Sequence, residues 1–398
     1  MKYCVLIMDG AAGWPVPGKG TLTTLEMART PNLDSMVSEG ALGKVRTVPQ
    51  GMEPSSACGC MSILGYDPQV YYQGRSGIEA RSMGVPLQEG EIVFRCNLVA
   101  VGDGKMWSYS AGHISTGEGR QLIHSLQESL GDHEVHFYPG VGYRNLCVIK
   151  GREDTLQAIC TPPHDIPNKT VKGFLPQGPG SEFLRRLMSR SEEVLRDHPV
   201  NQERRSRGDM PATTVWLFWG SRQSPELPPF KQRFGLKAAL TSGVDLLRGM
   251  AGMAGMASLD IAGVTDGPDN DYAAQASGAL AALQEHDLVV IHIEAPDEAG
   301  HGGDVKQKIE ALENIDREVV GRLREWRGDA LRVMVLPDHA TPIAIQTHAP
   351  EPVPFLMWGP GFSGNGAKRF TEVQAGVTGL FVTEGHALMS RWLSAARA

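Results

Sequence analysis

Three apolar runs, each followed closely by an aspartate, dominate the hydrophobic pattern of the chain. They cover residues 3–8, 288–293 and 331–336 and contain few polar side chains. Runs that do not alternate apolar and polar positions are typical of central strands in a parallel sheet that is buried on both faces. Amphipathic helices are predicted over residues 273–283 and 310–324, on either side of the second run. Because helix and strand alternate, the pattern predicts an α/β fold with a mostly parallel sheet flanked by helices.

The pattern changes between residues 78 and 232, where short apolar runs alternate with turns rich in glycine and proline. Such a change predicts an α+β unit inserted into the main domain. We therefore expect a core domain in two parts, residues 1–77 and 233–398, with the inserted unit over residues 78–232.

Composition narrows the class of protein. The chain has 398 residues, 41% of them hydrophobic and 21% charged, which is ordinary for a soluble globular protein. Its net charge of −7 argues against a nucleic-acid partner. No apolar run is long enough for a membrane span or a signal peptide, so we expect a cytoplasmic protein without a membrane partner. The six cysteines follow no disulfide framework and are interpreted as reduced thiols.

Aspartates and histidines gather just after the three predicted strands and in one later loop. The set is Asp9, Asp297, His301, Asp338, His339 and His348. A single Asp–His pair is as often a turn former beside a surface histidine. Because the carboxyl ends of parallel strands meet at one edge of a sheet, three such ends together favour a site for divalent metals of the zinc or manganese kind.

Ser56 adds a hydroxyl to this set. It lies among the small residues 55–59, where an amphipathic segment begins. A serine at the start of a helix either caps the helix or faces a phosphate that is bound by the backbone N–H groups. With Ser56 the ligands suffice for two metals: Asp9, Ser56, Asp338 and His339 on one, and Asp297, His301 and His348 on the other. Two metals about 4 Å apart suit in-line phosphoryl transfer.

Three basic residues near predicted strand ends or turns of the inserted unit are candidates for anion binding. They are Arg95, His113 and Arg144. Each one alone is more commonly a solvated surface group. Phosphate recognition nevertheless needs only a few local basic groups, and it is compatible with the acidic composition.

These residues, with several further motifs, resemble the alkaline-phosphatase superfamily and, within it, the cofactor-independent phosphoglycerate mutases of the archaeal type. The resemblance covers nearly the whole chain. Its motifs are Met8–Gly10, Arg29–Asp34, Leu64–Pro68, Gly74–Ser76, Phe94–Asn97, Pro296–His301, Asp338-His339 and His348–Pro354.

The resemblance implies an alkaline-phosphatase-like core and a glycolytic isomerase. Ser56 would take the phosphoryl group from 3-phosphoglycerate and return it to the 2-hydroxyl, while the inserted unit closes over the substrate. Two divalent ions are implied, Mn²⁺ in our interpretation, with Zn²⁺, Mg²⁺ or Co²⁺ as alternatives, and no bisphosphoglycerate. The implied substrate-binding residues are Arg95, His113, Arg144 and Lys237.

The chain departs from the family pattern at two positions. Ala57 stands where relatives usually carry Asp after the serine, and Gln275 stands where they tend to carry Lys. Residues 109–114 and 161–165 resemble a bacterial branch with a proposed homoserine kinase role. A homoserine kinase-like phosphotransferase in threonine biosynthesis, a metal-dependent phosphomonoesterase and a non-enzymatic metal-binding fold are therefore the alternatives, although the chain has no P-loop.

Overall fold

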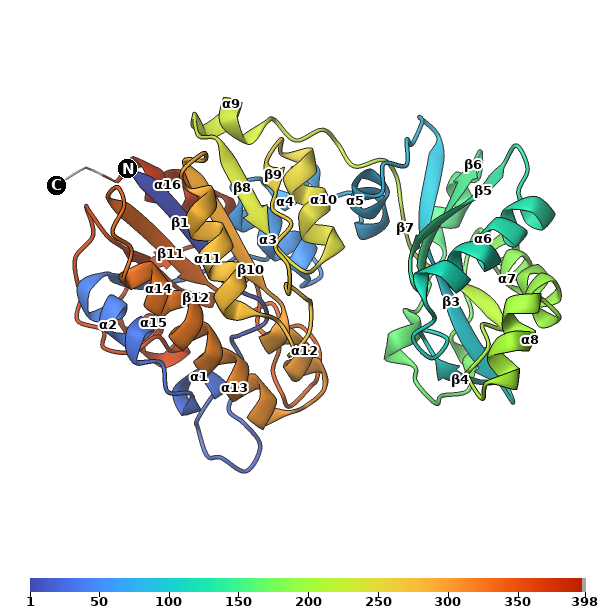
Figure 1. Ribbon diagram of the computed structural model, residues 1–398, viewed down its shortest axis with the longest axis horizontal. Coiled ribbons are helices and arrows are strands. Elements are labelled where there is room, and N and C mark those ends of the chain that lie inside the picture. Colours follow the sequence, from blue (N-terminus) through green and yellow to red (C-terminus); the bar gives the residue numbers. More distant parts are fainter. Residues whose placement is uncertain (396–398) are drawn as a thin grey trace. The chain divides into compact units, whose positions relative to one another are not determined.

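The computed structural model describes residues 1–395, and its chain forms two compact units (Figure 1). The first unit comprises Met1–Tyr72 and the chain from Glu226 onward, and the second comprises Gln73–Pro225. The predicted insertion, 78–232, differs at both ends. Helix α5 (Arg75–Ser82) packs on strands of the second unit, whereas α9 (Phe230–Phe234) belongs to the first.

The first unit is built on an eight-stranded sheet in the order β13-β2-β12-β11-β1-β10-β8-β9. Only β12 runs antiparallel to its neighbours. The strands are β1 (Lys2–Met8), β2 (Ala41–Val45), β8 (Ala238–Thr241), β9 (Ala257–Ser258), β10 (Leu288–Ile293), β11 (Leu331–Leu336), β12 (Val353–Trp358) and β13 (Phe381–Val382).

The three predicted apolar strands are confirmed as β1, β10 and β11, and they lie side by side with β1 in the middle. Every residue of β10 and β11 is buried, as is β1 from Tyr3 onward. Because successive side chains point to opposite faces, both faces of the sheet are covered there. The predicted α/β fold with a mostly parallel sheet flanked by helices is confirmed.

Helices surround this sheet in chain order. They are α1 (Thr24–Met27), α2 (Pro31–Glu39), α3 (Ser56–Ile63), α4 (Pro68–Tyr71), α9, α10 (Asp245–Met253), α11 (Tyr272–Ala282), α12 (Ala295–His301), α13 (Val305–Asn314), the π-helical turn η4 (Ile315–Val320), α14 (Gly321–Arg324), α15 (Glu372–Val377), the 3-10 turn η5 (Gly385–Ala387) and α16 (Leu388–Ser394). The predicted helix over 310–324 spans α13, η4 and α14 and starts earlier than expected. Within residues 1–395 no helix is both long and apolar enough to cross a membrane.

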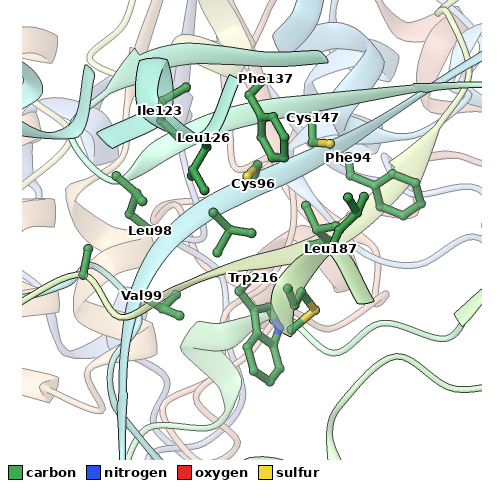
Figure 2. Close-up of a cluster of buried hydrophobic side chains, with 14 of the residues drawn as sticks. Phe94, Cys96, Leu98, Val99, Ile123, Leu126, Phe137, Cys147, Leu187 and Trp216 are labelled. Carbon is green, nitrogen blue, oxygen red and sulfur yellow. The ribbon is translucent and has the colours of Figure 1, made fainter. Parts of the chain in front are cut away.

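The second unit is an α+β unit with five antiparallel strands. The strands are β3 (Glu91–Gly102), β4 (Lys105–Ser108), β5 (Val135–Val141), β6 (Arg144–Lys150) and β7 (Thr214–Ser221). Its helices are α5, α6 (Thr116–Leu130), α7 (Ser181–Arg196) and α8 (Pro199–Ser206), with 3-10 turns η1 (Glu153–Gln157), η2 (Pro163–Asp165) and η3 (Val171–Gly173). Apolar side chains of the sheet and of α6 and α7 form its core, including Phe94, Leu126 and Trp216 (Figure 2). All six cysteines of the protein are unpaired, as predicted.

A charged network fastens the start of α6 to α8. The Glu118 carboxylate accepts hydrogen bonds from the Ser115 backbone and hydroxyl, and it pairs with Arg204 at 2.8 Å and Arg207 at 2.6 Å. Burial raises the pKa of Glu118, but the hydrogen bonds from Ser115 and Arg207 and the charge of Arg204 outweigh it and lower the pKa to about 2. The ionised carboxylate therefore stabilises the folded second unit.

We expect Glu118→Gln to lower the free energy of unfolding at neutral pH by about 1.5–3 kcal/mol, the range for hydrogen bonds to charged groups. Because the folded pKa is depressed, this contribution is present above the unfolded value of about 4.3 and is lost as the pH falls to about 2. Urea denaturation of both proteins at several pH values should show the difference shrinking in acid. Glu203→Gln removes an exposed partner of the same Arg207 and should change stability by no more than about 1 kcal/mol. A difference that is independent of pH would contradict this assignment.

Candidate metal centre

The carboxyl ends of three neighbouring strands bring the candidate residues together. Since β10 and β11 both pair with β1 in parallel, the three strands end at the same edge of the sheet. Asp9 directly follows β1, Asp338 lies two residues past β11, and Asp297 lies in the first turn of α12. All three aspartates are buried, with at most 3% of their surface exposed.

One set of ligands forms around His339. Its Nε2 atom lies 3.5 Å from Asp9 Oδ1, 3.3 Å from Asp338 Oδ2 and 3.3 Å from Ser56 Oγ. Ser56 is the first residue of α3, and Ser55 before it is the residue that caps the helix. The predicted nucleophile therefore points into the cluster instead of capping, as one interpretation of the sequence allowed.

A second set forms around Asp297. His301 Nε2 lies 3.1 Å from Asp297 Oδ2, and His348 Nε2 lies 3.6 Å from Asp297 Oδ1. The rings of His339 and His348 have centroids 4.0 Å apart, which joins this set to the first. The structure thus gathers all seven predicted metal-site residues into one cluster.

The tautomers of two histidines fit a cation. Nδ1 of His301 contacts the carbonyl oxygen of Gln346, and Nδ1 of His348 contacts that of Pro54. Because a carbonyl can only accept, each Nδ1 carries the hydrogen, and in a neutral ring Nε2 then carries a lone pair. The two Nε2 atoms lie only 2.9 Å apart. Lone pairs that face each other and a carboxylate need a cation between them.

The electrostatics of the cluster point the same way. Burial raises the pKa of Asp9, and the charges of Asp338 and Asp297 raise it further. Burial also raises the pKa of Asp297, but hydrogen bonds from His301 and His348 outweigh it and lower this pKa well below its usual value. Within residues 1–395, Asp9 Oδ1 is buried without a hydrogen-bond partner. Buried carboxylates this close together are stable only when protons or cations offset their charge, so divalent metals fit the residues present.

Two polar residues that the sequence pattern did not reveal support the cluster from behind. The Thr341 hydroxyl donates a short hydrogen bond to Asp297 Oδ1 and lies 3.3 Å from His339 Nδ1, so it contacts both ligand sets. Lys308 is fully buried, and its Nζ donates to the carbonyl oxygens of Gly10 and Thr341, each at 2.7 Å. Lysine in an amphipathic helix normally reads as a solvated group, so no local signal distinguishes Lys308.

The two departures from the family pattern lie next to the cluster. Ala57 is buried in α3 directly after Ser56. Gln275 is fully buried, donates to the carbonyl oxygen of His292 and accepts from Asn270. Its amide therefore anchors strand β10 from behind.

The predicted substrate-binding residues are not brought together. Lys237 is exposed and precedes β8, at the amino edge of the sheet and opposite the carboxyl ends that carry the cluster. Arg95, His113 and Arg144 all lie in the second unit. Arg95 is buried and pairs with Glu79 at 2.7 Å, while His113 has a left-handed backbone with φ of 52°.

Close packing of α3 against the loop after β11 gives a test of the cluster. A Cβ atom added at Gly59 would lie 2.4 Å from the Asp338 carbonyl oxygen and 2.9 Å from its Cβ. Gly59→Ala should therefore displace Asp338 and weaken Mn²⁺ binding by about 10- to 100-fold in isothermal titration calorimetry. Gly252→Ala, in α10 with open space at its Cβ, should leave Mn²⁺ affinity unchanged. Equal Mn²⁺ affinities for the two variants would show that Asp338 is not a ligand.

Comparison with known proteins agrees with these features. Residues 37–201 match the family model described as 2,3-bisphosphoglycerate-independent phosphoglycerate mutase. A structure of the PH0037 protein from Pyrococcus horikoshii covers 100% of this chain and 98% of its own, with a TM-score of 0.81 and 25% identity. A structure of the cofactor-independent phosphoglycerate mutase from Thermoplasma acidophilum covers 99% of both chains, with a TM-score of 0.62 and 24% identity, and shares the fold.

Relatives with higher identity bear the same name. A 2,3-bisphosphoglycerate-independent phosphoglycerate mutase of Methanothrix thermoacetophila is 46% identical over 98% of both chains. A protein named 2,3-bisphosphoglycerate-independent phosphoglycerate mutase 2, from Methanothermobacter thermautotrophicus, is 43% identical over 98% of this chain and 96% of its own. This chain therefore belongs to the archaeal-type family of 2,3-bisphosphoglycerate-independent phosphoglycerate mutases and is an isomerase, as its motifs predicted.

Proposed function

We propose that the protein interconverts 3-phosphoglycerate and 2-phosphoglycerate through a phosphoserine at Ser56, in a centre for two divalent metals. The observation that carries this proposal is the position of Ser56 Oγ, 3.3 Å from His339 Nε2 in the cluster of seven residues. A structural metal site has no need of a hydroxyl at this place. The printed names of the relatives support the same substrate pair.

The residues divide into two proposed ligand sets. Asp9, Ser56, Asp338 and His339 would hold one cation, and Asp297, His301 and His348 the other. When bound, the cations would favour the ionised serine and offset the charge on the phosphoryl oxygens. We expect Mn²⁺, since mixed histidine and carboxylate ligands suit it, with Zn²⁺, Mg²⁺ or Co²⁺ as alternatives.

Ser56 would act as the nucleophile in both directions. Its Oγ would form a bond to phosphorus as the bond to O3 of 3-phosphoglycerate breaks, and O3 would gain a proton to balance the one that Ser56 loses. Glycerate would then reorient, and its O2 would take the phosphoryl group from Ser56. The sum of the steps leaves the enzyme unchanged and needs no bisphosphoglycerate.

The second unit is proposed to bind the substrate and to exclude water, which would otherwise hydrolyse the phosphoserine. Arg95 and Arg144 are the proposed anion-binding residues, because a guanidinium binds a carboxylate or phosphate bidentately. Glu79 supports this role because it holds Arg95 and Arg75 through the same carboxylate. The unpaired thiols and the expected substrate are consistent with a cytoplasmic enzyme.

Ser56→Ala should abolish phosphoserine formation and lower turnover by more than about 10³-fold, because no other hydroxyl takes its place. Mass spectrometry after incubation with 3-phosphoglycerate would detect the phosphoserine. Ser55→Ala is the matched control, since it removes a helix cap at a cost of about 1 kcal/mol and should retain labelling at Ser56. Full activity in Ser56→Ala would exclude this nucleophile.

An enolase-coupled assay tests the reaction itself. With 3-phosphoglycerate, Mn²⁺ and no bisphosphoglycerate, we expect turnover that stops after chelation and returns when Mn²⁺ is restored. Release of inorganic phosphate in place of 2-phosphoglycerate would identify a phosphomonoesterase instead. Consumption of ATP in proportion to added homoserine, without mutase turnover, would favour the kinase alternative.

A further inference from the structure

A third group of potential ligands lies beside the two proposed sets. It consists of Asp9, Cys60 and His292, whose ligand atoms all lie within 4.8 Å of one another. All three residues are buried, Cys60 completely and His292 with 1% exposed. The proposed mechanism uses Asp9 alone of these, so Cys60 and His292 have no role in it.

His292 occupies a position between a hydroxyl and two carboxylates. Its Nδ1 lies 3.0 Å from Ser242 Oγ, and its Nε2 lies 2.7 Å from Asp9 Oδ2 and 3.7 Å from Glu294 Oε2. A hydrogen on Nε2 would satisfy Asp9. It would leave Glu294 Oε2, which is buried without a hydrogen-bond partner among residues 1–395, next to a second acid. A cation in place of that hydrogen would serve both carboxylates.

Cys60 provides the third donor from the opposite side. It lies on α3, four residues after Ser56, and its thiol is 3.6 Å from Asp338 Oδ2. The helix therefore presents a sulfur atom as well as the serine oxygen to the acidic edge of the sheet. A thiolate, an imidazole and a carboxylate together form a ligand set that soft divalent ions prefer over Mg²⁺ or Mn²⁺.

We propose that Asp9, Cys60 and His292 form a third cation site, which is selective for thiophilic divalent ions such as Zn²⁺ or Cd²⁺. Binding converts the Cys60 thiol to a thiolate and releases its proton to solvent. Glu294 lies beside the ion and offsets its charge. The site goes beyond the proposed mutase reaction, with which it shares only Asp9.

Titration of metal-free, full-length protein with Cd²⁺ tests this site without substrate. Thiolate ligands give Cd²⁺ an ultraviolet charge-transfer band that carboxylate and imidazole ligands do not give. We expect the band in the wild type and its loss in Cys60→Ser. Cys58→Ser is the matched control, because Cys58 lies on the same helix but outside the ligand group, and it should keep the band.

Two results would overturn the proposal: a saturated wild type without the band, or a Cys60→Ser variant that keeps it. Near-ultraviolet circular dichroism that matches the wild type would show that Cys60→Ser is folded. The outcome is separable from the mutase proposal. Absence of phosphoserine in the wild type would overturn the mechanism and leave the band intact, whereas absence of the band would leave the Mn²⁺-dependent reaction intact.

Discussion

The structure depends on how it neutralises the negative charge that is buried at the carboxyl edge of its main sheet. Asp9, Asp338 and Asp297 are all buried there, and Glu294 lies against Asp9. The one lysine beside them, Lys308, donates to the carbonyl oxygens of Gly10, Ala12 and Thr341 and not to the carboxylates. Cations from solution are therefore the natural partners of these acids, and metal binding is coupled to the stability of the first unit.

The surrounding backbone prepares the ligands for that role. Carbonyl groups of Pro54 and Gln346 fix the tautomers of His348 and His301, so that the lone pairs of both rings face Asp297. Thr341 links Asp297 to His339, and Lys308 connects the loop after β1 to the loop after β11. These contacts fix the ligand geometry without touching a metal, which is how outer contacts usually tune metal sites.

The sequence revealed the part of this arrangement that follows from local pattern. Apolar runs located β1, β10 and β11, and the parallel-sheet rule placed Asp9 and Asp338 at one edge. Lys308 remained hidden because its helix has an ordinary amphipathic pattern and only tertiary packing buries it. His292 was read as part of an apolar strand, since the pattern does not show which polar group faces it.

The misplacement of Lys237 has the same physical origin. It was assigned from family resemblance, without a strand prediction to show which end of β8 it occupies. In a parallel sheet the two ends of a strand have opposite meanings, since function gathers at the carboxyl end. Lys237 precedes Ala238, the first residue of β8, and therefore lies at the wrong edge.

Every member of the proposed metal centre belongs to the first unit, while Arg95 and Arg144 belong to the second. The acids, histidines and serine needed for phosphoryl transfer thus assemble whenever the first unit folds. The arginines are positioned separately, by the sheet of the second unit and by Glu79. Because neither set packs through the other, substitutions on Arg95 or Arg144 can alter substrate choice without disturbing the ligand geometry. This separation explains physically how one metal centre can serve a mutase, a phosphatase or another phosphotransferase, depending on what the second unit recognises and how well it excludes water.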